Sequence, residues 1–375
     1  MKVALILSVT LLSLAIIIFT FLTIILRFWR INRSKRYALH RAKVRKLIVE
    51  LTIGEEEPSD QNFTRKLKLG QLEELSESIA TKVKGESKDR LVSFLESKGS
   101  VTKAIRRTRR LGSIGKCNAA SFLGNLSIVR GRPALEALLG SRNREVRISA
   151  ARALGQIGLP ESIPALLDSL DRPGKQLPFG TCIVALLDIG PKGEEYILAG
   201  LEGAGERQRA ACSEMLGIIN SIKSTQALID HFQNDSSIDV RIRCARALGR
   251  IGSPRAVSQL IKGLEDDNPL PLRLVSCRSL GQLGDPEAVP AIANLLTSDN
   301  HQLLNTAVQT LSQLSSEGFK SLTSLAVSHS PNRDYALEAL ARKSVKSAVI
   351  EPQLEPLEVL FDYQWDKFWQ TYFEF

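Results

Sequence analysis

A unit of about 31 residues recurs along the middle of the chain, and it constrains the fold more than any other feature of the sequence. The segments REVRISAARALGQIGLPESIPALLDSL (144–170), DVRIRCARALGRIGSPRAVSQLIKGL (239–264) and PLRLVSCRSLGQLGDPEAVPAIANLL (271–296) follow one pattern. With Gly155 as the reference, equivalent residues recur at steps of 30 to 32: Gly124, Gly155, Leu187, Gly217, Gly249, Gly281 and Ser312. A period this regular predicts seven stacked units from about 113 to 332, with a degenerate closing segment near 333–346.

Each unit has the pattern of two helices. Apolar and small residues fall at i, i+3, i+4 and i+7 in the first half, which ends in a glycine that can cap a helix. A proline or short polar residue then opens the second helix, as at Pro160, Pro254 and Pro286. One such helix pair cannot bury its apolar face alone, so its neighbours must cover it. We therefore predict an all-α fold.

These segments resemble the short bacterial HEAT repeats of the type also found in phycobilisome lyases. The resemblance covers the region from about 113 to 332. It implies an α-solenoid of about seven HEAT-like helical hairpins, in a family made mostly of binding scaffolds. The segment KDRLVSFLESKG (88–99), with the basic helix and the array that follow it, resembles the start of bacterial membrane-anchored HEAT proteins. This resemblance implies a context, that of an accessory subunit in a membrane enzyme complex such as a glycosyltransferase.

The N-terminus predicts a membrane anchor. Residues 3–26 are 24 residues without a charge. At about 1.5 Å per helical residue they can cross a hydrocarbon core of about 30 Å. This stretch is too long for the apolar region of a cleaved signal peptide, so we predict a transmembrane signal anchor at 1–29.

A basic segment follows the apolar stretch and predicts the orientation of the chain. It carries nine positive charges, which nearly equals the net charge of +10 of the whole chain. By the positive-inside rule, the body is expected in the cytoplasm, with a single pass through the plasma (inner) membrane. We expect this segment to contact anionic headgroups, and we disfavour nucleic acid as its partner. The predicted membrane-surface residues are Arg27, Trp29, Arg30, Arg33, Lys35, Arg36, Arg41, Lys43, Arg45 and Lys46.

Composition changes divide the rest of the chain. A basic juxtamembrane segment and acidic linker span 30–62, a helical N-terminal cap spans 63–112, and the solenoid spans 113–346. A proline-containing linker and an acidic aromatic tail occupy 347–375. Within the cap, residues 101–112 carry a second basic cluster, which is either a solvated helix face or a contact for membrane phosphates or an acidic partner.

The cysteines and several arginines occupy fixed positions in the repeat. Cys182, Cys212 and Cys244 align with Ala150, and Cys277 with Ala151, so we predict buried packing thiols rather than metal or redox groups. A second set, Arg147, Arg209, Arg241 and Arg273, shares one position. Such a ladder could grip an anion. We favour the alternative that each arginine satisfies carbonyls or an acid in the turns between repeats.

No catalytic motif is recognisable. Nucleophile-elbow, phosphate-loop, dinucleotide-binding and zinc spacings are missing from the sequence. His40, His231, His301 and His329 are scattered, and we expect each of them on a surface or in a loop. We predict no catalytic residue, cofactor or metal, and no enzyme activity.

The last residues form one aromatic face. Phe361, Trp365, Phe368 and Tyr372 lie at helical spacing with Trp369 alongside, in a segment rich in acidic residues. Three fates are open: the tail closes the end of the solenoid, docks into a partner, or enters the membrane interface. These five residues are the predicted partner-binding site.

Together, these features predict a membrane-tethered cytoplasmic HEAT-repeat scaffold or adaptor that binds another protein. One alternative is a lyase-like enzyme subunit that handles a small-molecule chromophore, as the resemblance implies for that branch. Another is a nucleic-acid-binding solenoid, which would need basic residues along one face. The repeat helices alternate charges instead, as at Glu161, Asp168, Arg255 and Lys262.

Overall fold

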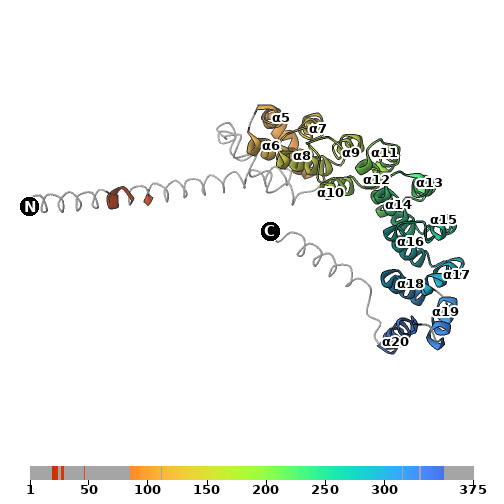
Figure 1. Ribbon diagram of the computed structural model, residues 1–375. Helices are drawn as coiled ribbons and strands as arrows, with labels where there is room; N and C mark the ends of the chain where they lie inside the picture. Colours follow the sequence, from red (N-terminus) through yellow and green to blue (C-terminus); the bar gives the residue numbers. More distant parts are fainter. Residues whose placement is uncertain are drawn as a thin grey trace, which may run out of the picture. The chain divides into compact units, whose positions relative to one another are not determined.

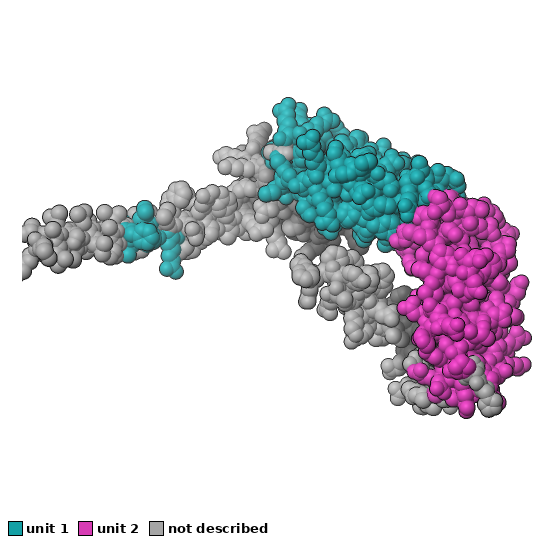
Figure 2. All heavy atoms as spheres, viewed as in Figure 1, with its two compact units in different colours: residues 1–211 teal, residues 212–375 magenta. Residues whose placement is uncertain are grey.

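The computed structural model describes residues 85–349, except 111, 315 and 329–330, together with the short stretches 19–23, 27–28 and 46. Every regular element between residues 85 and 349 is a helix (Figure 1). The chain divides into two compact units, residues 1–211 and 212–375 (Figure 2). The all-α prediction is confirmed for the described residues.

Between residues 85 and 211 of the first unit, two helices precede three helix pairs. The two are α4 (Glu86–Ser97) and α5 (Ser100–Arg110). Each pair joins a longer helix, through a 3-10 turn, to a shorter one: α6 (Ser113–Asn125), η1 (Val129–Gly131) and α7 (Arg132–Leu138); α8 (Arg144–Ile157), η2 (Pro160–Ser162) and α9 (Ile163–Asp168); α10 (Phe179–Ile189), η3 (Gly190–Gly193) and α11 (Glu194–Leu201).

The unit boundary falls within α12 (Glu206–Ile218), and the same pattern continues in the second unit. The elements there are η4 (Ile222–Ser224) and α13 (Thr225–Asn234); α14 (Ile238–Ile251), η5 (Pro254–Ala256) and α15 (Val257–Lys262); α16 (Leu270–Leu283), η6 (Pro286–Ala288), α17 (Val289–Asn294) and η7 (Leu295–Thr297); α18 (His301–Gln313), α19 (Ser316–Val327) and α20 (Arg333–Val349).

Within each unit the longer helices of successive pairs pack side by side. In the first unit α8 lies between α6 and α10, and in the second α16 lies between α14 and α18. The shorter helices cover the same core, for example α7 against α8 and α15 against α16. Leucines such as Leu123, Leu154 and Leu248 are fully buried there. The core therefore runs along the rows of helices, as stacked repeats require.

The glycines that define the register mark where neighbouring longer helices approach most closely. A Cβ atom on Gly155 would lie 2.8 Å from the Cα of Ala185, and one on Gly249 would lie 2.8 Å from the Cα of Ser279. The same backbone obstruction exists for Gly124 against Ala153 and Gly217 against Ala247, whereas a Cβ on Gly281 would meet the side-chain methyl of Thr310. Glycine costs a helix interior about 1 kcal/mol relative to alanine. Here the absence of a side chain allows two backbones to meet.

The predicted glycine caps at the C-terminal ends of the longer helices are confirmed, whereas the predicted starts of the shorter helices are corrected. Gly158, Gly252 and Gly284 follow α8, α14 and α16 in the left-handed conformation, with φ of 75°, 72° and 72°. They are the predicted glycine caps. The prolines at 160, 254 and 286 instead open 3-10 turns, and each α-helix begins three residues later. The fixed φ of proline and its missing N–H suit the start of either kind of helix.

Four thiols are buried, as predicted, at what we call the helix seam, where the longer helices of successive repeats pack together. Cys182, Cys212, Cys244 and Cys277 are 0% exposed, and all are free. Burial raises the pKa of Cys182 to about 12 and that of Cys277 to about 11. Cys117, on α6, is half-buried. The four buried thiols pack as small apolar groups, and at Cys182 and Cys277 burial also disfavours the reactive thiolate form.

We predict that Gly155→Ala destabilises the protein. The new methyl group would meet the backbone of α10, which cannot move aside as a flexible side chain would, and overpacking costs about 1–3 kcal/mol. Urea unfolding followed by circular dichroism measures the effect. The matched control is Gly180→Ala on α10, where nothing lies within 4 Å of an added Cβ and stability should be unchanged or slightly higher. Equal stability of the two variants would contradict the close-approach role of Gly155.

We also predict that alkylation by iodoacetamide separates the thiols into two groups. In the native protein, Cys117 should react well before the four buried thiols, and in urea all five should react at similar rates. Mass spectrometry of the digested protein measures the alkylation rate of each thiol. The Cys117→Ser variant should lack the fast-reacting thiol. Rapid native labelling of Cys182 or Cys277 would show that these thiols are not packing groups.

Candidate functional site

Most of the predicted site residues lie outside the described part of the chain. This holds for the whole predicted partner site: Phe361, Trp365, Phe368, Trp369 and Tyr372. Of the membrane-surface residues, only Arg27 and Lys46 fall within the described stretches, and both are exposed. Among the described residues, no helix has the length and hydropathy needed to cross a bilayer. Most of the predicted anchor, including residues 3–18, is not among them.

The arginines of the ladder donate hydrogen bonds to carbonyl groups of the turns between repeats. Arg147, 6% exposed, donates to the carbonyls of Ser141 and Arg142 at 2.9 and 3.1 Å and to that of Gln176 at 3.3 and 3.0 Å. It thereby ties the turn before its own helix to the turn of the next repeat. Arg209 donates to the carbonyls of Gly203 and Ala204. These bonds confirm the carbonyl interpretation.

The second unit repeats this arrangement with small changes. Arg241 donates to the Phe232 carbonyl at 2.9 Å and to Asn268 Oδ1 at 3.0 Å. Arg273 donates to the Leu264 carbonyl at 3.0 Å and lies 2.6 Å from Asp266. The guanidinium group suits this place because it offers five donors in a fixed plane.

The histidine prediction is wrong for one residue. His231 lies in α13, with its side chain only 16% exposed, and its Nδ1 is 3.0 Å from Oδ2 of Asp235. Oδ1 of Asp235 accepts from the Ser237 amide, so the pair orders the turn after α13. His301 is exposed at the start of α18, with its Nδ1 2.9 Å from the Tyr335 hydroxyl. His40 and His329 lie outside the described residues.

Four arginines on neighbouring helices of the second unit form what we call the arginine surface: Arg243, Arg246 and Arg250 on α14, and Arg278 on α16. The first three converge on Glu214 of α12, with N–O distances of 3.3, 3.3 and 2.7 Å. Arg278 has on α16 the position of Arg246 on α14, is exposed, and has no ion pair among the described residues. This surface therefore has more positive than negative charge.

Glu214 is held ionised at the edge of the arginine surface. Its side chain is only 13% exposed. Burial alone would raise the pKa of Glu214, but the hydrogen bond from Arg250 and the charges of the three arginines outweigh it and hold the pKa below its ordinary value. The carboxylate stays charged at neutral pH and fixes the orientation of the guanidinium groups.

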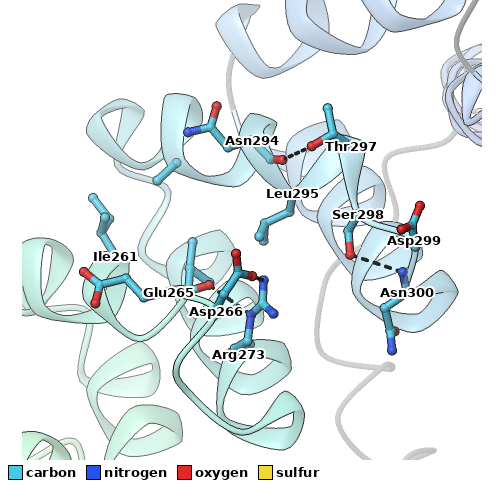
Figure 3. A pocket seen from close by; sticks show the side chains of 12 residues that line it. Ile261, Glu265, Asp266, Arg273, Asn294, Leu295, Thr297, Ser298, Asp299 and Asn300 are labelled. Carbon is cyan, nitrogen blue, oxygen red and sulfur yellow. Dashed lines mark hydrogen bonds and ion pairs between the residues drawn. The ribbon is translucent and has the colours of Figure 1, made fainter.

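An acidic cleft of about 640 Å³ lies between α15, α17 and the turns that follow them (Figure 3). Its described lining includes the carboxylates of Glu265, Asp266 and Asp299 and one cation, Arg273. Because Arg273 is already paired with Asp266, the cleft as a whole is negative.

A basic cleft of about 560 Å³ occupies the corresponding place at the first helix pair, between the end of α5, the start of α6, and α7 with its following turn. Arg109, Lys116 and Arg142 line it, and no carboxylate is among its described lining residues. Arg109 belongs to the predicted second basic cluster. Lys116 has the ladder position of the first repeat, eight residues before Gly124.

Each of the two clefts is lined by a turn of its own with the sequence Ser-X-Asn. In the basic cleft, the Asn143 amide donates to Ser141 Oγ at 3.3 Å, and Asn143 Oδ1 caps α8. In the acidic cleft, Asn300 and Ser298 form the same bond at 3.2 Å, and Asn300 caps α18. The middle residue is Arg142 in one and Asp299 in the other. Aligning these two turns in the sequence could have found the difference, but only the fold shows that both line a cleft.

Comparison with known proteins supports the repeat assignment. The HEAT repeat family matches residues 114–177, 225–312 and 271–342. No curated protein matches the chain at a significant level. The unmatched segment 178–224 includes the repeat that carries Leu187 at the register position and Phe179 at the ladder position.

Solved structures with a similar arrangement share little sequence. The complex of CpcE and CpcF of phycocyanin lyase from Nostoc sp. PCC7120 is 18% identical, over 68% of this chain and 98% of that one, with a TM-score of 0.28. Kap121p is 13% identical, over 80% and 45%, with a TM-score of 0.37. Human deoxyhypusine hydroxylase in complex with glycerol is 20% identical, over 81% and 97%, with a TM-score of 0.30. At such scores these likenesses carry no conclusion about activity. From the family match, the chain contains HEAT repeats in both of its compact units.

Proposed function

We propose that the protein is a membrane-tethered scaffold whose HEAT-repeat body lies in the cytoplasm and binds another protein, without catalytic activity of its own. The uncharged residues 3–26 and the basic residues after them are the basis for the membrane part of the proposal. The arginine surface of the second unit is the observation that carries the binding part.

The arginine surface suits a partner with exposed carboxylates. Three of its four guanidinium groups pair with Glu214, and Arg243 also pairs with Asp239, so four positive charges meet two carboxylates and positive charge is left to attract an acidic surface. Arginine can bind a carboxylate through two parallel hydrogen bonds, and it is enriched in protein interfaces. Arg278 is the best placed to do so, because it is exposed and has no ion pair with the described residues.

The use of the other polar groups also favours a binding role. The ladder arginines are bonded to carbonyls of the turns, and Cys182 and Cys277 are buried with raised pKa values. These side chains support the repeat packing. The groups that remain available lie on surfaces, which is where a scaffold needs them.

The aromatic tail is proposed as a second contact with the same partner. Tryptophan and tyrosine are frequent anchors of interfaces, and an aromatic helix face can enter a partner's groove. The context that the family resemblance implies, an accessory subunit of a membrane enzyme complex such as a glycosyltransferase, remains part of this proposal.

Membrane tethering predicts that the full chain resists extraction from membranes by alkaline carbonate. A variant lacking residues 3–26 should be released, because the basic segment alone binds headgroups reversibly. Immunoblots of the pellet and supernatant measure this. Recovery of the full chain in the carbonate supernatant would contradict the anchor.

The binding proposal predicts that Arg278→Glu lowers recovery of the partner at least about tenfold, because a like charge then faces the partner's carboxylates. Crosslinking and affinity purification from membranes, with quantitative mass spectrometry, measures it. Arg255→Glu is the matched control: it reverses one exposed arginine on η5, in the same unit but outside the arginine surface. Arg243, Arg246 and Arg250 are left intact because Glu214 needs them. Equal losses in the two variants would contradict a specific surface.

A chain ending before Glu351 tests the tail in the same purification. If the tail contacts the partner, this chain should recover less of it, while Arg278→Glu still has its own effect. Recovery of the same partners in full would exclude the tail contact and leave the arginine surface as the binding site.

A further inference from the structure

We propose that the basic cleft at the first helix pair binds a phosphate group. Three elements bring a cation to it: Arg109 from the last turn of α5, Lys116 from α6, and Arg142 from the turn after α7. No carboxylate is among the described residues that line it. Three like charges around a cleft of about 560 Å³ repel one another, and a bound anion would remove that repulsion.

The three cations are also available. In the described part of the chain, none of them forms an ion pair or a hydrogen bond through its side chain. Lys116 is informative because the arginines at the same repeat position, such as Arg147, are bonded to turn carbonyls. A lysine ammonium is a compact point charge and a common phosphate ligand.

The start of α6 adds donors to the same cleft. Ser113 lines it at the first position of this 13-residue helix. The preceding residue, Gly112, provides no side-chain cap, so the amides of the first turn are not used by a capping side chain. Such amides and the helix dipole favour an anion. They supplement the three cations and would not form a site without them.

The turn itself does not need a cation at position 142. Asp299 occupies the equivalent place in the Ser-X-Asn turn of the acidic cleft, with the same serine bond and the same asparagine cap. The positive charge of Arg142 is therefore free to serve a ligand. Arg142→Asp should keep the turn and reverse the charge, which makes it a clean test.

Phosphate is favoured over a carboxylate ligand by the number and spread of the donors. A phosphate monoester presents three oxygens and close to two negative charges, so cations from three directions can each contact it. The group could be part of a lipid headgroup or of a soluble phosphorylated molecule. Both sources share this chemistry. Other basic residues of α5, such as Lys103 and Arg106, would attract either one to the cleft.

The test uses the full chain in nanodiscs of phosphatidylcholine, with or without phosphatidic acid. The acetylation rates of Lys116 and of the exposed Lys192 are followed by mass spectrometry, with inorganic phosphate or with chloride at the same ionic strength. We expect phosphate to slow acetylation of Lys116 and to leave Lys192 unchanged. In Arg142→Asp, half-protection should need at least about tenfold more phosphate, from the usual strength of a charged hydrogen bond.

Controls separate the cleft from general charge effects. Arg110→Asp makes the same change on an exposed residue of α5 that does not line the cleft and should shift half-protection less than about threefold. Arg109→Gln tests the cleft again without touching the turn. Protection by added phosphate in phosphatidylcholine discs identifies a soluble ligand, and protection only with phosphatidic acid identifies a headgroup. The proposal is overturned if Lys116 is protected in neither case, if chloride protects equally, or if Arg142→Asp behaves as the native chain.

Discussion

The contact between a register glycine and the next longer helix is the constraint on which the rest of the structure depends. It lets two backbones meet at positions such as Gly155 against Ala185, where a methyl group would already collide. Side chains near this seam must therefore be small. The thiols one turn earlier, Cys182 and Cys244, meet that condition while remaining apolar. Since each pair buries its face on a neighbour, the same spacing must hold at every step within a unit.

The arginine ladder follows from this spacing. Two turns of successive repeats come near enough for one side chain to reach both, as Arg147 does with the carbonyls of Ser141 and Gln176. Carbonyls at the ends of short helices need donors, and a buried carbonyl without one costs about 1–3 kcal/mol. Where the ladder residue is not arginine, as at Lys116, this link between turns is missing and its charge faces the basic cleft.

Periodicity allowed much of the fold to be predicted, because the glycine cap and the opening proline are local signals that recur in each unit. The function of the register glycines was not predictable in the same way, since a helix-interior glycine signals a close approach only once its neighbour is known. The ion pairs of Glu214 join residues 29 to 36 positions apart, and they depend on how α12 and α14 are rotated. The predicted tail and the predicted anchor belong to no repeat, so periodicity makes no prediction about them.

Function in such a chain is expected at the positions where the repeats differ. The shared positions serve packing: the register glycines allow close helix contacts, the seam thiols are buried, and each ladder arginine donates to at least one carbonyl of the turns. The turns are free to vary once their serine and asparagine are present. Arg142 and Asp299 show this directly, because one turn geometry places opposite charges in two similar clefts. In these turns, a departure from the repeat therefore indicates which cleft binds a charged ligand.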